Sequence, residues 1–371
     1  MPDLFEKTTI NIMTLANRFV RSATWEGLAG DDGSVTPALI ERMVALARGE
    51  TGLIITGNAF VSPEGRGARK QLGVYSDSLL EGLASMVKTV HDAGGRIALQ
   101  LAHAGILADA TVSGLPAVGP SLLEDHPACK ELDTDAILSL IESFAQAAVR
   151  AQKAGFDAVQ VHAAHGYLLN EFLSPAFNHR TDAYGGKLEN RARALLDVVA
   201  AVRAAVKPTY PVLVKINAED FIDNGLNRED SIVVASMLEK ASVDAVEISG
   251  GSKVSGVALM PARKGRIKTP AQEVYHREAA KIYKERVSIP LILVGGIRSF
   301  GVAEELVRSG AADYISLARP LICEPELVKR WHSGDRRPAL CVSDNACYAP
   351  GFSGEGIRCV TFEKKRAHTA G

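Results

Sequence analysis

Hydrophobic residues along the chain gather in eight short runs, separated by longer segments that carry apolar residues at helical spacing. Runs that read as continuous Val, Ile and Leu are typical of strands buried on both faces, as in parallel sheets. The segment 134–156 illustrates the helical spacing between them. The eight runs are 17–24, 52–58, 96–103, 157–165, 212–219, 244–251, 290–297 and 314–321.

Eight strand–helix units predict an α/β fold, the closed (β/α)8 TIM barrel. An open doubly wound sheet is the alternative, but no GxGxxG opens a helix early in the chain. Residues 6–16 partly alternate and predict a β-hairpin that caps the barrel floor. We expect the barrel over 1–335 and an irregular C-terminal extension over 336–371.

Two connections are longer than a barrel requires. Both residues 104–133 and residues 252–274 follow strands, so they lie on the carboxyl face where barrels of this kind hold their sites. Long connections in a compact fold tend to be functional. We therefore expect these two loops to shape a binding site.

Composition narrows the choice of partners and compartment. The 371 residues include 42 basic and 43 acidic side chains, well mixed, for a net charge of −1. This balance argues against a nucleic-acid partner, and no apolar run is long enough to span a membrane. The N-terminus lacks an apolar signal core, and the odd number of cysteines, 5, fits a reducing compartment. We expect a cytoplasmic protein.

The fourth run ends in an unusual group of rings. Gln160 and His162 share a strand face, whereas His165 can join His162 only if the chain turns, which Gly166 allows. Tyr167 follows. Two N–H donors aimed at one oxygen, with a phenol nearby, can stabilise developing negative charge and supply a proton. The alternatives are ordinary hydrogen-bonded histidines or a metal pair, but no third ligand is evident, so we expect no metal.

Other polar residues stand at the ends of later runs. Gly295 and Gly296 end the seventh run, and Arg319 follows the eighth. Loops at these places frequently bind phosphate in such barrels, and Arg supplies a forked cation. Lys215 lies within an apolar strand, where an unpaired ammonium is costly, so it needs an anionic partner. It could form a Schiff base or face a ring that becomes an anion on reduction.

Seven motifs stand in order along the chain: NRFVRSATWEG, GLIITGNAFVSPEGRG, LQLAHAG, VHAAHGYLLNEFLSPAFNHRTDAYGGKLENR, VLVKINAED, LVGGIRS and LARP. Together they resemble the Old Yellow Enzyme family of flavin-dependent ene-reductases, over residues 3–335. The stretch 162–191 is the most specific, and its HxxH pair is closer to the bacterial and dienoyl-CoA-reductase-like branches than to the yeast-like branch.

The resemblance implies an FMN-binding barrel over 1–335. His162 and His165 would hold the carbonyl oxygen of a substrate above the ring, and Tyr167 would donate a proton. The residues implied for FMN surround its ring and phosphate: Ser22, Ala23 and Thr24 on one side, Asn58 and Gln100 at the pyrimidine edge, Lys215 at N1 and O2, His162 beside the ring, and Gly295, Gly296, Ala318 and Arg319 at the phosphate.

The resemblance also implies an activity. NADH or NADPH would reduce FMN, hydride would pass to the β-carbon of an α,β-unsaturated carbonyl compound, and Tyr167 would protonate the α-carbon. A homo-oligomer is expected, because relatives often form one. The alternatives are a flavin dehydrogenase, a reductase of enoyl or dienoyl thioesters, and, in another class, a flavin-free phosphate-binding lyase that uses Lys215.

The chain departs from the family pattern at two places. Trp25 falls where relatives carry a Cys or Thr that tunes the flavin, and we expect it to pack in the core or shape the pocket, with the Thr24 hydroxyl as a substitute. In the extension, Asp344 stands where larger relatives have one of four cluster-binding cysteines, which leaves the other three as a degenerate motif: Cys341, Cys347 and Cys359. Cys129 and Cys323 are expected to be packed or loop thiols.

Overall fold

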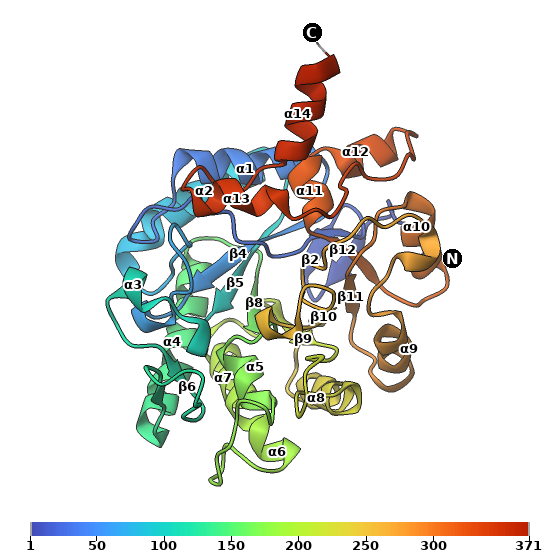
Figure 1. Cartoon of the computed structure of the whole chain (residues 1–371). Coiled ribbons are helices and arrows are strands. Elements are labelled where there is room, and N and C mark those ends of the chain that lie inside the picture. Colours follow the sequence, from blue (N-terminus) through green and yellow to red (C-terminus); the bar gives the residue numbers. More distant parts are fainter. Residues whose placement is uncertain (1, 370–371) are drawn as a thin grey trace.

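Eight parallel strands close into a barrel in a computed structural model, which describes residues 2–369. Each strand pairs with the next, and the last returns to the first. Every one of the eight hydrophobic runs coincides with one strand, and only β4 extends beyond its run, so the predicted barrel is confirmed (Figure 1). The strands are β3 (Phe19–Arg21), β4 (Leu53–Phe60), β5 (Ile97–Ala102), β8 (Ala158–Ala163), β9 (Val212–Asn217), β10 (Ala245–Ser249), β11 (Leu291–Val294) and β12 (Tyr314–Leu317).

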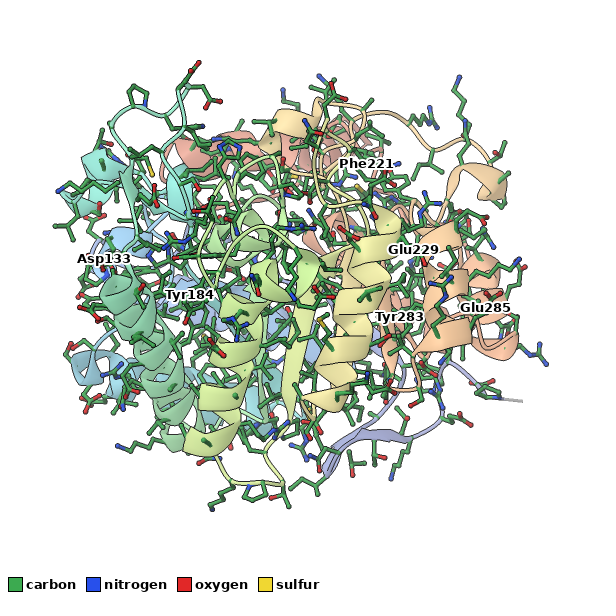
Figure 2. All side chains as sticks on the ribbon, turned by 90° about the horizontal axis from the view of Figure 1, so that it is seen from below. Asp133, Tyr184, Phe221, Glu229, Tyr283 and Glu285 are labelled. Carbon is green, nitrogen blue, oxygen red and sulfur yellow. The ribbon has the colours of Figure 1, made fainter. Side chains whose placement is uncertain are left out.

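Helices follow the strands and cover the outside of the barrel. Side chains cap the N-termini of some of them: Thr36 accepts from the N–H of Leu39, and Asp133 from that of Ala136. In Figure 2, Glu229 and Tyr283 mark two neighbouring members of this outer layer, α8 and α9. The helices are α1 (Pro37–Arg48), α2 (Leu80–Asp92), α4 (Thr134–Lys153), α7 (Arg193–Ala205), α8 (Arg228–Lys240), α9 (Arg277–Arg286), α10 (Phe300–Arg308) and α12 (Leu327–His332).

An antiparallel hairpin, β1 (Thr8–Ile10) and β2 (Met13–Leu15), plugs one end of the barrel. Its buried side chains join a cluster formed by inward residues near the start of the barrel strands. The predicted hairpin at the barrel floor is therefore confirmed, and the opposite, carboxyl end is the one left for a site. The hairpin contributes Ile10, Met13 and Leu15 to this cluster.

The loops at the carboxyl end carry short elements of their own. The connection after β5 contains η3 (Gly105–Leu107), α3 (Ala110–Ser113) and the paired strands β6 (Val118–Gly119) and β7 (Lys130–Glu131). The connection after β8 contains α5 (Leu168–Leu173) and α6 (Leu188–Arg191). The connection after β10 has only two single turns, η4 (Lys253–Ser255) and η5 (Pro270–Gln272).

The C-terminal extension folds back onto the loop that follows the first barrel strand. The chain is irregular over 335–345 and then forms η6 (Ala346–Tyr348), α13 (Ala349–Phe352) and α14 (Val360–Thr369). The N–H of Ile357 donates to the carbonyl of Glu26, and Lys70 Nζ to that of Gly354. The extension thus reaches the same end of the barrel as the long loops. None of the helices in the described part of the chain is long and apolar enough to cross a membrane.

Candidate functional site

A cavity of about 360 Å³ lies at the carboxyl ends of the strands. Most of the residues predicted for the site line it, although they come from six of the eight strands and their following loops. Gly295 and Gly296 are not among the lining residues. The predicted residues that do line the cavity are Ser22, Ala23, Thr24, Asn58, Gln100, His162, His165, Tyr167, Lys215, Ala318 and Arg319.

The three rings of the fourth run converge on this cavity. His162 lies within β8, and the chain then leaves strand geometry, with positive φ angles of 66° at His165 and 76° at Gly166. The ring centroid of His162 lies 5.1 Å from that of His165 and 4.8 Å from that of Tyr167. Left-handed backbone is costly for a histidine, so the turn needs support from its surroundings.

A buried hydrogen-bond network supplies this support. The side-chain oxygen of Asn217 accepts from the N–H of His165 at 3.1 Å, and that of Asn170 accepts from the N–H of Gly166 at 2.7 Å. Both amide nitrogens donate to Asp220 Oδ1, at 3.1 Å from Asn170 and 2.8 Å from Asn217. Because a carboxylate only accepts, Asp220 fixes which end of each amide faces the turn. Sequence reasoning missed this network, although Asn217 lies within the predicted strand and Asp220 directly follows it.

Burial keeps the two imidazoles neutral. It lowers the pKa of His162 to about 3, with Lys215 adding to the effect, and it lowers the pKa of His165 well below the usual value, with His162 the next cause. Nε2 of His165 lies 2.7 Å from the hydroxyl of Ser249. His162 Nδ1 is buried and has no hydrogen-bond partner among the described residues. A buried polar atom in this state is suited to a ligand.

Tyr167 stands at the start of α5, directly after the turn. Its hydroxyl oxygen accepts a hydrogen bond from Asn58 Nδ2 at 2.8 Å. Burial raises the pKa of Tyr167, whereas the bond from Asn58 lowers it. The phenol is therefore protonated at neutral pH and has a partner for its oxygen. The structure thus bonds the Asn58 side chain to Tyr167, a contact that the sequence did not suggest.

Lys215 has the anionic partner that its burial demands. Its Nζ lies 3.3 Å from Glu247 Oε2, and both side chains are almost fully buried. Burial lowers the pKa of Lys215. Burial alone would raise the pKa of Glu247, but Lys215 and three hydrogen bonds hold it below the usual value. Those bonds come from Ser22 at 2.7 Å, Ser316 at 2.8 Å and Gln160 at 2.9 Å. Glu247 is the one carboxylate in β10, a strand that is otherwise largely apolar. The sequence therefore contained a signal for this partner of Lys215 that was not used to predict it.

The predicted phosphate end is only partly assembled around the cavity. Arg319, at the start of α11 (Arg319–Cys323), donates from Nη1 to the carbonyl of Arg263 at 2.9 Å and to Asn345 Oδ1 at 2.6 Å. A Cβ on Gly296 would meet the ring of Tyr275 at 2.4 Å. Close packing against Tyr275 therefore favours glycine at this position, in addition to the phosphate role expected from the sequence.

Aromatic residues from opposite ends of the chain form one wall of the cavity. The rings of Trp25 and Phe352 lie with their centroids 5.4 Å apart and their planes tilted by 32°, and Tyr348 lines the same cavity. Trp25 therefore shapes the pocket, one of the two roles expected for it. The hydroxyl of Thr24 donates to the carbonyl of Ser22 at 3.0 Å. Its proton is therefore already used and is not free to tune the flavin in place of the Cys or Thr of relatives.

The remaining cysteines of the extension lie around a separate hollow. Cys341, Cys347 and Cys359 line a space of about 200 Å³ together with Asp344 and Arg319. No group of three or more His, Cys, Asp or Glu in the described part of the chain is arranged to hold a metal ion.

The fourth cysteine in this region is Cys323, which is buried as expected. It is hydrogen-bonded to Cys359, and this contact lowers the pKa of the Cys359 thiol to about 7. The same contact, with burial, raises the pKa of Cys323. Cys129 is likewise buried.

These features define a class of protein: a (β/α)8 barrel with a cofactor-sized cavity at its carboxyl end, a buried lysine in the lining and paired neutral imidazoles. The cavity suits FMN by its donor set. Lys215 can face a ring that gains negative charge, and Arg319 lies at one end as a cation for phosphate.

Comparison with known proteins then identifies the family. Residues 3–337 match the model of the NADH:flavin oxidoreductase / NADH oxidase family, and the chain belongs to it. It is 35% identical to an NADPH dehydrogenase of Bacillus subtilis, over 87% of this chain and 92% of that protein. It is also 35% identical to an NADH oxidase of Thermoanaerobacter brockii, over 96% of this chain but 55% of that protein.

Solved structures agree with this assignment. An Old Yellow Enzyme homologue from Zymomonas mobilis superposes with a TM-score of 0.78 at 30% identity, covering 95% of this chain and 99% of that one. A 2-naphthoyl-CoA reductase in complex with 2-naphthoyl-CoA gives a TM-score of 0.87 at 27% identity, covering 97% of this chain. The chain spans 56% of the length of the 2-naphthoyl-CoA reductase and 55% of that of the NADH oxidase, so about half of each of these two proteins.

The expected family is confirmed, and with it the class of FMN-dependent enzymes that use NADH or NADPH. Membership counts against the flavin-free lyase.

Proposed function

We propose that the chain is an FMN-dependent ene-reductase, which uses NADH or NADPH to reduce the carbon–carbon double bond of α,β-unsaturated carbonyl compounds. The observation that carries the proposal is the convergence of His162, His165 and Tyr167 on the cavity that also holds Lys215. Bound FMN supplies the hydride for the β-carbon. The roles of the side chains follow from their geometry and protonation.

The imidazoles bind and polarise the carbonyl oxygen. As neutral rings each has one N–H to donate, and Ser249 at Nε2 of His165 leaves Nδ1 of that ring for a ligand. His162 offers its unpartnered Nδ1. Donors held in place before reaction stabilise the negative charge that builds on oxygen as hydride arrives, and removing one such donor typically costs roughly 3–4 kcal/mol of the barrier.

Tyr167 donates the proton to the α-carbon. Its raised pKa keeps the phenol protonated through the neutral range, so the proton is present when the enolate forms. Lys215, charged beside Glu247, favours negative charge near the part of the cavity that it lines. The predicted FMN contacts of Ser22, Ala23, Thr24 and Gln100, and the phosphate contacts of Gly295, Gly296, Ala318 and Arg319, form part of this proposal.

Stopped-flow kinetics of the two half-reactions test it. In Tyr167→Phe, flavin reduction by NADPH should proceed at the wild-type rate, because the phenol takes no part in it. Reoxidation of the reduced enzyme by 2-cyclohexen-1-one should slow at least tenfold. Equal loss in both half-reactions, or wild-type reoxidation, would remove Tyr167 as the proton donor.

A thioester substrate is the second candidate, favoured by charge at the cavity mouth. The connection after β10 has no acidic residue between 252 and 272, and its Lys253 lines the cavity. Such a loop suits the phosphates of an acyl-CoA. The structure of the 2-naphthoyl-CoA reductase holds a ligand of this type. Comparing kcat/KM for an enoyl-CoA with that for the free enone decides between the two. The basic residues of the loop are Lys253, Arg263, Lys264, Arg266 and Lys268.

The expected homo-oligomer and the expected cytoplasmic location stay predictions. Light scattering of the purified holoenzyme tests the first, and cell fractionation the second.

A further inference from the structure

Asn58 lies at the cavity and is hydrogen-bonded to Tyr167, the proposed proton donor. Its side chain lines the cavity, is 9% exposed, and donates from Nδ2 to Tyr167 Oη at 2.8 Å. Among the residues that the structure describes, no acceptor is hydrogen-bonded to the Tyr167 hydroxyl. The phenol therefore receives a hydrogen bond and has its own proton free.

This direction of the bond determines where the phenol proton can go. The amide N–H occupies one lone pair of the phenol oxygen, and the hydroxyl hydrogen cannot point along the same line. Tyr167 lines the cavity, which leaves the cavity as the place for its proton. After the proton leaves, the same N–H faces a phenolate, and hydrogen bonds to a charged acceptor are shorter and about twice as strong.

The backbone around Asn58 is fixed by groups on both sides. Strand β4 shifts its register against β5 between Ile55 and Asn58, an irregularity of the kind that re-aims side chains near sites. Gly57 donates its N–H to Glu26 Oε1 at 2.9 Å, and Gln71 Nε2 donates to the carbonyl of Asn58 at 3.1 Å. The amide is therefore presented to Tyr167 by a strand segment whose backbone is hydrogen-bonded to Glu26 and Gln71.

We propose that Asn58 is a positioning residue for proton transfer: it turns the Tyr167 O–H toward the substrate and stabilises the phenolate that remains. The proposal rests on the proposed function. In the step itself, the O–H bond of Tyr167 breaks and a C–H bond forms at the α-carbon of the enolate. The electron pair of the O–H bond stays on the phenol oxygen, opposite the Asn58 N–H, until a proton from solvent restores the phenol.

Two substitutions separate the donor role from mere packing. Asn58→Ala removes the N–H, and Asn58→Asp replaces it with an acceptor that draws the phenol proton away from the cavity. Each is combined with Tyr167→Phe, and the reoxidation rate with 2-cyclohexen-1-one is divided by the rate of flavin reduction in the same variant. We expect this ratio to fall about tenfold in Asn58→Ala and about a hundredfold in Asn58→Asp. Neither substitution should lower it further once Tyr167 is Phe.

A measurement without turnover completes the test. In holoenzyme with ¹³Cζ-labelled tyrosine, the Tyr167 signal is identified by its absence from Tyr167→Phe, and its pKa should rise in Asn58→Ala. An unchanged pKa, or equal slowing by Asn58→Asp with and without the phenol, would overturn the role of Asn58. If Tyr167→Phe alone reoxidises at the wild-type rate, the proton-donor function falls, and the role of Asn58 with it.

Discussion

The buried pair beneath the site makes a sharp prediction about stability. Replacing Glu247 by Gln keeps the shape of the side chain but leaves the ammonium of Lys215 without an anion. The two groups lie 3.3 Å apart with side chains 2% and 0% exposed, so water cannot replace the lost partner. Breaking a buried pair from one side costs roughly 3–5 kcal/mol. We expect about 3 kcal/mol, the lower end of that range, because glutamine can still bond to the Ser22 and Ser316 hydroxyls.

Urea unfolding at pH 7 with saturating FMN measures this loss as a lower free energy of unfolding. The double variant Lys215→Met/Glu247→Gln should recover a large part of it, since neither charge of the pair remains. Asp92→Asn is the matched control, because Lys88 and Asp92 form a pair with side chains 76% and 62% exposed. That exposed pair should contribute less than about 1 kcal/mol. A Glu247→Gln protein as stable as the Asp92→Asn protein would refute the reasoning.

Three further predictions concern the cofactor, the turn and pH. Arg319→Ala should weaken FMN binding at least tenfold, measured as FMN released on gel filtration, and unchanged retention would count against a phosphate role. Asp220→Asn puts an N–H where the amides of Asn170 and Asn217 need an acceptor, so it should disturb the turn that carries His165. It should weaken or abolish the charge-transfer absorbance that phenols give with the flavin, and His165→Ala should do the same. An undiminished absorbance band in both variants would show that the turn does not support ligand binding. Burial lowers the pKa of His276 to about 3 from an ordinary 6.5, so its contribution to stability is complete above pH 6.5 and is lost as the pH falls from 6.5 toward 3. At pH 5 the stability lost through His276 amounts to roughly 2 kcal/mol. The variant His276→Gln should therefore lose less free energy of unfolding than wild type between pH 7 and pH 5. Equal losses would show that burial does not lower the pKa of His276.

The barrel could be predicted because its strands are buried on both faces. A strand such as β11 is apolar along its whole length, and that pattern is visible without any knowledge of its neighbours. Strand order then follows from the alternation with helices. The site residues at strand ends could be placed for the same reason, because the carboxyl ends of all eight strands meet at one face.

Contacts between distant segments could not be predicted in this way. Asn58 and Tyr167 are 109 positions apart, and their hydrogen bond depends on a register shift in β4 that no local pattern encodes. The pairing of Lys215 with Glu247 depends on the register between β9 and β10. Sequence reasoning could state that the lysine needs an anion but not which carboxylate faces it.

The aromatic wall of the cavity has a consequence for the order of events during synthesis. Tyr348 and Phe352 emerge from the ribosome after all eight barrel strands, so a nascent chain can close its barrel while the pocket still lacks one side. A flavin entering at that stage would meet a pocket without the wall that Tyr348 and Phe352 form. Trp25, made near the beginning, gains its ring contact with Phe352 only at the end of this process.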